Sequence, residues 1–328
     1  MVDEPIRIGA LELKNRLAMA PVAVYKATEE GKITPEACAH YQQRAQLSGV
    51  GLIITEHLFI APEGQAKPCQ ISISRDSDTI GLSTLADACH NNGVAAFAQI
   101  SHAGGAARKS VMGLDPVAPT AMVSSQAWVA KEGDGIPREL DAEGIARIVA
   151  AFADAARRAC EAGFDGVEIH SAHAYLLNEF YSPLHNKRTD EYGGTLEGRL
   201  RIHREVLAAV RAAVSDEFVV GMRLGGCDYE EGGATIEDAV EAARILAASG
   251  VDYLSLSGGW HAWRRAGHEE PGWFADQSRA VKAAVDTPIL LAGGIQTPEQ
   301  ADVLLADGTC DIAGIGRPLL KNPSWPKN

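Results

Sequence analysis

The sequence predicts an α/β protein folded as a (β/α)8 TIM barrel, and three observations carry this prediction. Eight short apolar runs alternate with longer amphipathic stretches, as in parallel strands that are covered by helices. The chain has 328 residues, which suits one such barrel, so we expect a single domain over residues 1–328. No GxGxxG motif follows the first apolar run, so an open dinucleotide-binding sheet is the less favoured alternative.

The eight expected strands follow one another along the chain. They cover residues 17–22, 51–55, 95–100, 166–170, 219–224, 253–257, 289–292 and 312–316. Most of them are apolar on both faces, which is typical of strands buried between a barrel interior and an outer layer of helices. Residues 4–14 precede the first strand, and we expect them to form a small hairpin across the barrel floor, with Gly9 and Ala10 at the turn.

The stretches between the strands carry helix signals. Residues 297–300 offer a threonine N-cap, a proline at the first helical position and a glutamine that can complete a capping box. Thr235 with Asp238 is a weaker version of the same pattern. A glycine stands just before each of several strands, where it can adopt the left-handed conformation that ends a helix. These glycines are Gly49, Gly93, Gly163, Gly250 and Gly308.

Composition and charge exclude several classes of protein. The net charge of −13 argues against nucleic acid or an anionic membrane surface as a partner. The sequence contains no run of about 18 apolar residues, so it predicts no membrane span. The acidic N-terminus lacks the apolar segment of a secretory signal. The six cysteines are scattered, with no CxxC pair. We therefore expect a cytoplasmic protein with reduced cysteines that acts on a small molecule.

In a barrel of this kind the active site lies at the carboxyl ends of the strands. Two long loops are expected there, at residues 102–140 and 258–274, and the second contains three tryptophans and two histidines. Long loops in a compact domain are usually functional lids. We interpret the tryptophan-rich loop in this way.

The end of the fourth strand carries the side chains with the clearest chemical potential. His170 stands at the strand tip, His173 lies about one helical turn onward, and Tyr175 follows two residues later. Two imidazole donors could bind one oxyanion, and a phenol could deliver a proton. A metal site is the alternative interpretation, but no third histidine lies close by, so we expect no metal ligand set.

Residues 170–194 resemble the signature of the old yellow enzyme family, also called NADH:flavin oxidoreductases. The resemblance covers nearly the whole chain in order. It includes residues 15–21 in the first strand, Gln99 with residues 102–104 after it, Arg223 in the fifth strand and residues 314–318 in the eighth. The details are most similar to the bacterial branch with a His/His pair, which includes the barrel domain of 2,4-dienoyl-CoA reductase.

The resemblance implies FMN as the cofactor. Gln99 would bind the pyrimidine edge of the flavin, and Arg223 would place positive charge near the N1/C2 carbonyl. Gly293, Gly294, Gly316 and Arg317 would form the phosphate corner after the last two strands. His57 stands where the family's backbone contacts the flavin, so its imidazole would be new to the pocket. The implied cofactor residues are Ala20, Pro21, Val22, Ala23, His57, Gln99, Arg223, Gly293, Gly294, Gly316 and Arg317.

The same resemblance implies an NAD(P)H-dependent ene-reductase, in which hydride passes from NADH or NADPH through FMN to the activated C=C bond of an α,β-unsaturated carbonyl or enoyl compound. His170 and His173 would bind the carbonyl oxygen, Tyr175 would be the proton donor, and Tyr25 would contact the substrate. An oxidative N-methyl amine demethylase on the same fold is the alternative, and a non-redox phosphate-binding barrel is less favoured because no lysine stands at a strand end. Relatives often form homodimers or homotetramers.

Three features depart from the family pattern. Ala23 stands where many relatives have cysteine or threonine near the flavin, which leaves the redox potential open. Gly225 and Gly226 replace a small polar pair and are expected to widen the site. No cysteine cluster for an iron–sulfur centre follows the eighth strand within these 328 residues.

Arg188 and Asp190 are expected to form a structural ion pair rather than a catalytic one.

Overall fold

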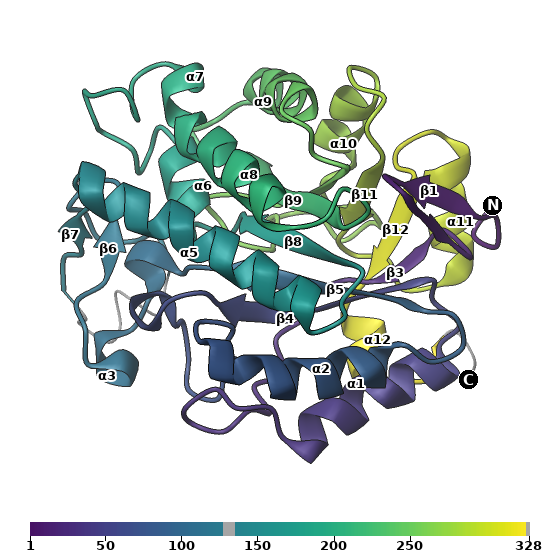
Figure 1. The fold of residues 1–328 in the computed structure, drawn as a ribbon. Helices are drawn as coiled ribbons and strands as arrows, with labels where there is room; N and C mark the ends of the chain where they lie inside the picture. The colour runs from purple at the N-terminus through teal and green to yellow at the C-terminus, as the bar shows by residue number, and fades with distance from the viewer. Residues whose placement is uncertain (127–134, 326–328) are drawn as a thin grey trace.

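Eight parallel strands form a closed barrel at the centre of the protein (Figure 1). The computed structural model describes residues 1–126 and 135–325. Consecutive barrel strands are neighbours, and the last strand pairs with the first, which confirms the predicted (β/α)8 barrel. The barrel strands are β3 (Leu17–Met19), β4 (Leu52–Phe59), β5 (Ala95–Ser101), β8 (Gly166–Ser171), β9 (Val219–Cys227), β10 (Tyr253–Gly258), β11 (Ile289–Ala292) and β12 (Ile312–Ile315).

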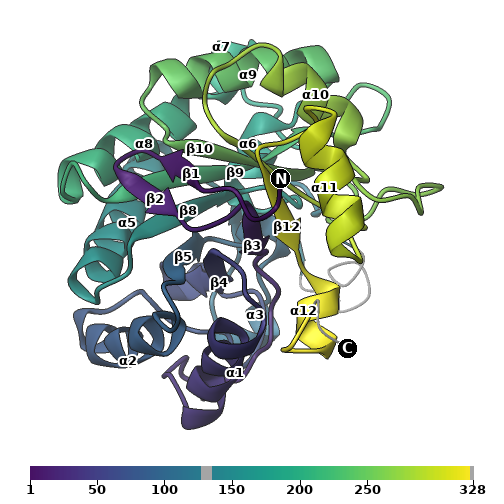
Figure 2. The same ribbon diagram turned by 90° about the vertical axis from the view of Figure 1, so that its right-hand side faces the viewer.

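Helices surround the barrel and cover the outer faces of its strands, as Figures 1 and 2 show from two directions. The main helices are α1 (Pro35–Leu47), α2 (Thr79–Cys89), α5 (Ala142–Glu161), α8 (Arg201–Ala213), α9 (Ile236–Ala248), α10 (Ala275–Lys282), α11 (Pro298–Ala306) and α12 (Arg317–Lys321). Further short helices lie in the loops: α3 (Lys109–Met112), α6 (Leu176–Tyr181), α7 (Leu196–Arg199) and the 3-10 helices η1 (Pro62–Gly64), η2 (Asp76–Asp78) and η3 (Gly104–Ala106). Within the described residues no helix is both long and apolar enough to cross a membrane.

The helix boundaries follow the predicted capping signals. The Thr297 hydroxyl accepts a hydrogen bond from the Gln300 backbone amide, and the Gln300 side chain accepts one from the Thr297 backbone amide, which forms a capping box at the start of α11. Thr235 and Asp238 form the same box at the start of α9. Each of the predicted helix-ending glycines has a positive φ, as a left-handed C-terminal residue requires. They are Gly49, Gly93, Gly163, Gly250 and Gly308.

The predicted hairpin closes the amino-terminal end of the barrel. Strands β1 (Ile6–Ile8) and β2 (Leu11–Leu13) pair antiparallel around Gly9 and Ala10. The side chains of Ile8 and Leu13 are fully buried in one apolar cluster with residues from the first positions of several barrel strands. The hairpin therefore covers this end of the barrel interior.

Three strands end three or more residues away from the predicted position: the first, the second and the fifth, which continues to Cys227. The differences in the first two affect the site. The first was expected to reach residue 22 but ends at Met19. The Ala20 amide still donates to the Ile315 carbonyl at 2.9 Å, but Pro21 has no N–H with which to continue the ladder. The second strand runs four residues further than expected, with a register shift between Ile54 and His57.

The long loop after β5 is not structureless. Its described residues contain η3, α3 and a two-stranded parallel sheet of β6 (Val117–Ala118) and β7 (Arg138–Glu139), while residues 127–134 of the predicted loop lie outside the described residues. Arg188 donates to the carbonyls of Pro119 and Leu140 at 3.0 and 2.6 Å and also pairs with Asp190. Arg188 thus ties the described part of this loop to the segment that follows α6.

Candidate active site

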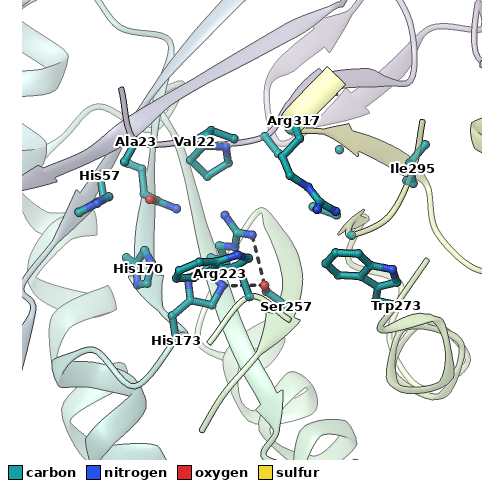
Figure 3. A pocket seen from close by; sticks show the side chains of 18 of the residues that line it. Val22, Ala23, His57, His170, His173, Arg223, Ser257, Trp273, Ile295 and Arg317 are labelled. Carbon is teal, nitrogen blue, oxygen red and sulfur yellow. Dashed lines mark hydrogen bonds between the residues drawn. The ribbon is translucent and has the colours of Figure 1, made fainter. Parts of the chain in front are cut away.

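A cavity of about 350 Å3 lies at the carboxyl-terminal end of the barrel (Figure 3). Every barrel strand, or the residue directly after it, contributes to the lining. All the residues that the sequence predicted for the site line this one cavity. They are Ala20, Pro21, Val22, Ala23, Tyr25, His57, Gln99, His170, His173, Tyr175, Arg223, Gly293, Gly294, Gly316 and Arg317. The volume falls within the ordinary range for small-molecule sites.

Sequence reasoning missed several lining residues. They are Lys67, Ser257, Trp263, Trp273, Ala292, Ile295, Gln296, Gly314 and Pro318. Both tryptophans come from the loop that was interpreted as a lid, and Trp263 remains 48% exposed at the cavity rim. Its ring stands edge-on to His173, with a centroid distance of 6.4 Å. The tryptophan-rich loop therefore forms one wall of the cavity.

The turn after β8 brings His170, His173 and Tyr175 together. His173 and Ala174 both have left-handed backbones, with φ of 61° and 54°, which is a costly conformation for residues with side chains. This reversal places the His173 ring 5.1 Å from that of His170 and stacks the Tyr175 ring on His170 at 4.8 Å. Burial lowers the pKa of both imidazoles well below the ordinary value, so they are neutral hydrogen-bonding groups.

Ser257 joins the histidine pair to a buried arginine. Its hydroxyl oxygen accepts a hydrogen bond from Arg223 at 3.2 Å and lies 2.7 Å from His173 Nε2 (Figure 3). Since the oxygen accepts from Arg223, the hydroxyl hydrogen is available to His173 Nε2. Under that assignment the proton of His173 resides on Nδ1. Arg223 Nε is buried without a protein partner, so the guanidinium retains an unsatisfied donor beside the cavity.

The two tyrosines remain protonated at neutral pH. Burial raises the pKa of Tyr175 above its ordinary value. Burial and then the Glu56 carboxylate raise the pKa of Tyr25 to about 12. Glu56 also accepts hydrogen bonds from the backbone amides of Val24 and Tyr25, each at 3.1 Å, which holds Tyr25 in a left-handed conformation with φ of 51°. Both phenols are consequently available as proton or hydrogen-bond donors.

A buried carboxylate fixes the orientation of Gln99. Gln99 Nε2 donates to Glu168 Oε1 at 2.7 Å, and the Tyr253 hydroxyl donates to Glu168 Oε2 at 3.0 Å. The amide nitrogen of Gln99 is therefore engaged inside the barrel, and its oxygen is the atom available as an acceptor. Glu168 is fully buried, and the nearby Arg223 charge favours its ionised form against the upward pKa shift from burial.

The corner after β11 and β12 is shaped by glycine and by one tryptophan. Gly293 and Gly294 have φ of 143° and 73°, and a Cβ on Gly294 would lie 2.6 Å from Trp273 Nε1. That indole N–H is buried without a partner. The Arg317 guanidinium lies over the Trp273 ring, 4.6 Å from its centroid. A fixed cation, an unsatisfied N–H and close backbone approach suit an anion with several oxygens.

The expectation that Gly225 and Gly226 widen the site is wrong, because neither lines the cavity. A Cβ on Gly225 would lie 2.9 Å from Asn178 Nδ2, and one on Gly226 would lie 2.7 Å from the Ala239 side chain. The two glycines therefore permit close packing of β9 against its neighbours.

The chain matches the model of one protein family over residues 2–328, the family described as "NADH:flavin oxidoreductase / NADH oxidase". It is 36% identical over 327 residues to an NADH oxidase from Thermoanaerobacter brockii, an alignment that covers 98% of this chain and 49% of that protein. The chain thus spans about half the length of this curated relative.

Two solved structures share the fold over 99% of this chain, each at 30% sequence identity. A 2-naphthoyl-CoA reductase in complex with 2-naphthoyl-CoA superposes with a TM-score of 0.92, and the match covers 51% of its chain. An old yellow enzyme homologue from Zymomonas mobilis superposes with a TM-score of 0.86, and the match covers 91% of its chain.

Proposed function

Since the chain belongs to the NADH:flavin oxidoreductase / NADH oxidase family, we propose that it is an FMN-dependent ene-reductase that uses NADH or NADPH to reduce an activated C=C bond. The observation that carries the proposal is the convergence of His170, His173 and Tyr175 on a cavity that also contains Arg223. Neutral donors for an oxygen and a protonated phenol are the groups that reduction of an enone requires.

The residues present fit FMN. Arg317, the Trp273 indole N–H and the backbone at Gly293 and Gly294 would hold the phosphate, since this corner combines an unsatisfied donor with a cation. The oxygen of Gln99 would accept from the pyrimidine N–H, because Glu168 already engages the amide nitrogen. FMN, when bound, supplies the hydride chemistry between NAD(P)H and the double bond.

Arg223 would neutralise negative charge at the pyrimidine carbonyl. Its guanidinium is buried and has an unsatisfied Nε, so an acceptor in the cavity would gain a charge-assisted hydrogen bond. The buried Glu168 carboxylate offsets the charge of Arg223, so the barrel interior does not hold an uncompensated cation.

His170 and His173 would hold the carbonyl oxygen of the substrate and stabilise the negative charge that develops there. Their neutral state matters, since a neutral imidazole can donate one hydrogen bond without adding a buried charge. Tyr175 would donate its phenolic proton to the carbon next to the carbonyl. The 4.8 Å stacking of its ring on His170 fixes the proton donor relative to the oxygen-binding pair.

The experiment begins with the cofactor and ends with turnover. Acid-released cofactor from the purified protein is expected to be FMN, and the bound flavin should be bleached by NADH or NADPH under anaerobic conditions. The reduced protein should then be reoxidised by 2-cyclohexen-1-one, and the double variant His170→Ala/His173→Ala should lose this step while it retains FMN. Turnover of an N-methyl amine with no turnover of the enone would contradict the proposal.

A further inference from the structure

The imidazole of His57 has a fixed tautomer. Gln70 Oε1 accepts from the Ala66 backbone amide at 2.8 Å, so the nitrogen of this side-chain amide is identified by its partners. Gln70 Nε2 then donates to the His57 carbonyl at 2.9 Å and approaches His57 Nδ1 at 2.8 Å. Nδ1 must therefore act as an acceptor, and the proton of the neutral ring resides on Nε2.

This ring stands among the substrate-binding groups. His57 lies in the wall formed by β4, with its centroid 5.5 Å from Tyr175 and 6.2 Å from both His170 and Tyr25 (Figure 3). Burial, together with the charges of Lys67 and Arg223, lowers the pKa of His57 to about 4. His57 thus presents a neutral donor to the cavity, and nothing in the proposed reduction uses it.

Lys67 lines the same wall. Its ammonium lies 5.3 Å from the centroid of the Tyr25 ring, and its charge acts on His57. Among the described residues that line the cavity, the cations are Lys67, Arg223 and Arg317. None of these lining residues is an aspartate or a glutamate. Glu168, which lies behind the lining, offsets the charge of Arg223, so Lys67 and Arg317 give the described lining a positive character that attracts anions. Arg223 and Arg317 serve the flavin in the proposed function, whereas Lys67 and the imidazole of His57 do not.

We propose that Lys67 and His57 form a second oxygen-binding subsite, which selects substrates that carry a carboxylate in addition to the activated double bond. The carboxylate would accept a hydrogen bond from His57 Nε2 and pair with the Lys67 ammonium, while His170 and His173 hold the carbonyl oxygen. The substrate class rests on the proposed function, but the binding of the carboxylate does not require turnover. Anionic oxygens could also come from the phosphates of NAD(P)H, and the experiment separates these two sources.

The test measures binding to the FMN-loaded protein by calorimetry. The probes are 4-hydroxybenzoate and 4-hydroxybenzamide, together with their 3-hydroxy isomers, so that the members of each pair differ in one substituent, an anionic carboxylate or a neutral amide of similar size. The readout is the selectivity ratio, the Kd of the amide divided by the Kd of the carboxylate. In at least one isomer pair the wild-type ratio should exceed roughly tenfold, because charge-assisted hydrogen bonds are about twice as strong as neutral ones.

Four variants locate the effect. Lys67→Met should reduce the ratio by roughly tenfold, and His57→Phe should reduce it by a smaller factor, since a neutral donor is lost in place of a charge. Lys67→Arg should keep most of the ratio. Lys32→Met is the matched control, because it removes the same charge from an exposed position outside the cavity. A ratio that stays within twofold of wild type in Lys67→Met would overturn the proposal.

Stopped-flow reduction by NADH and NADPH provides the second arm. The subsite proposal expects the apparent Kd of both dinucleotides to change by less than about threefold in Lys67→Met. A weaker dinucleotide affinity with an unchanged carboxylate ratio would assign Lys67 to the phosphates and overturn the proposal. If the wild-type protein failed to reduce enones, the proposed function would fall, whereas the calorimetric ratio would still decide whether the subsite exists.

Discussion

At the scale of single residues, Tyr175 separates the two halves of the proposed reaction. Its phenol is buried and protonated, and reduction of an enone needs a proton at carbon, whereas reduction of the flavin by NAD(P)H does not. Tyr175→Phe should therefore leave flavin reduction nearly unchanged. It should slow reoxidation by 2-cyclohexen-1-one by roughly 10²-fold, the usual effect of losing a positioned general acid. Stopped-flow absorbance measures both steps.

A quinone acceptor is the control for this variant, since its reduction needs no proton at carbon. Reoxidation by a quinone should change by less than about threefold. An enone rate equal to that of wild type would make Tyr175 a packing residue, and Tyr25 would become the candidate donor. Tyr25→Phe, which removes the other protonated phenol of the cavity, then decides between them.

Most of the residues that sequence reasoning found lie close to the carboxyl end of a barrel strand or in the turn directly after it. Ser257 has the same position and could have been found, but a serine at the end of an apolar run carries no distinctive signal. Lys67 and Trp273 are different, because neither stands at a strand end. Lys67 reaches the cavity through the turn after η1, and Trp273 reaches it through the loop before α10. Their places depend on loop paths, which periodicity does not encode.

At the scale of elements, the strands were easier to predict than the loops that position the site. Each buried strand is an apolar run, and each was placed within a few residues of its position in the barrel. The end of β3 was mistaken because an apolar run continues past Met19, although Pro21 cannot donate to a ladder. That early end is useful, since residues 20–23 are released from the sheet and line the cavity.

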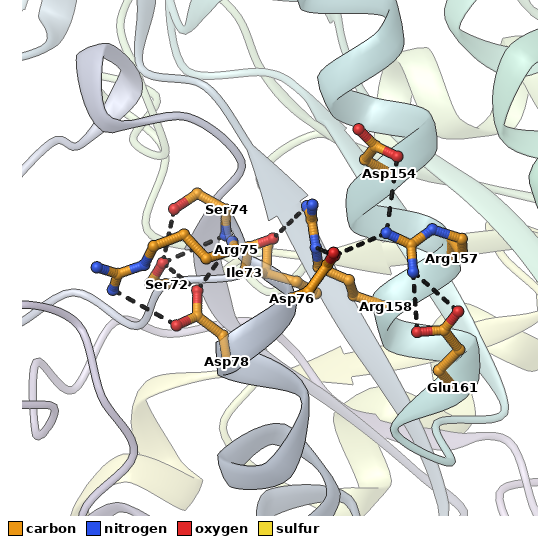
Figure 4. A network of polar contacts seen from close by, with 10 residues as sticks. All are labelled: Ser72, Ile73, Ser74, Arg75, Asp76, Asp78, Asp154, Arg157, Arg158 and Glu161. Carbon is orange, nitrogen blue, oxygen red and sulfur yellow. Dashed lines mark hydrogen bonds and ion pairs between the residues drawn. The ribbon is translucent and has the colours of Figure 1, made fainter.

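One polar network ties η2 to helix α5 (Figure 4). Arg158 is nearly buried, and it donates to Asp76 at 2.8 Å and to the Ile73 carbonyl at 3.2 Å. Arg157 reaches the same Asp76 carboxylate from a more exposed position and also pairs with Glu161. The buried arginine therefore satisfies a backbone carbonyl that the exposed one does not.

Arg158→Met should lower the free energy of unfolding by about 1–3 kcal/mol, because it leaves the Ile73 carbonyl without its buried partner. Arg157→Met is the matched control on the same helix, and it should cost less than about 1 kcal/mol, as is usual for exposed ion pairs. Urea unfolding monitored by circular dichroism measures both values. Equal losses in the two variants would mean that the surface charge, rather than the buried hydrogen bond, holds η2.

At the scale of the whole molecule, buried histidines make the fold sensitive to acid. Burial lowers the pKa to about 4 for four histidines and also lowers it for three more, so seven of the ten histidines are affected. They are His40, His57, His102, His170, His173, His185 and His203. The unfolded chain binds these protons near pH 6.5, and the folded chain does not. These histidines therefore cost no stability above pH 6.5, and the free energy of unfolding decreases as the pH falls from 6.5 towards their pKa values in the folded protein.

Each such histidine adds a slope of up to about 1.4 kcal/mol per pH unit below pH 6.5. His203→Gln should flatten the fall in unfolding free energy between pH 6.5 and 5, since its ring is buried beside Ser171 rather than in the cavity. His261→Gln is the control, because that imidazole is on the surface next to Glu230. Urea titrations at several pH values give the slopes. A slope unchanged by His203→Gln would show that the buried ring does not resist protonation.

Binding of FMN, with its phosphate in the corner after β11 and β12, should raise the free energy of unfolding of the whole barrel. Ligand that binds only the folded state adds RT ln(1 + [L]/Kd), about 2.7 kcal/mol when free FMN is 100 times its Kd. Arg317→Ala should weaken FMN binding by roughly tenfold or more, because a charge-assisted contact to phosphate is lost. At the same free FMN concentration the variant would then gain only about 1.4 kcal/mol from the cofactor. Thermal unfolding of protein stripped of flavin, with and without added FMN, measures the difference.

Riboflavin, which has the ring system of FMN without the phosphate, localises the effect. It should stabilise the wild type and Arg317→Ala equally, since neither complex contains the contact that the substitution removes. Arg317→Lys should fall between wild type and alanine with FMN, because lysine keeps the charge but loses the planar fork and its stacking on Trp273. If Arg317→Ala lowered stabilisation by riboflavin as much as by FMN, Arg317 would act through the shape of the corner and not through phosphate. In that case the unpaired indole N–H of Trp273 would become the main candidate for the phosphate contact.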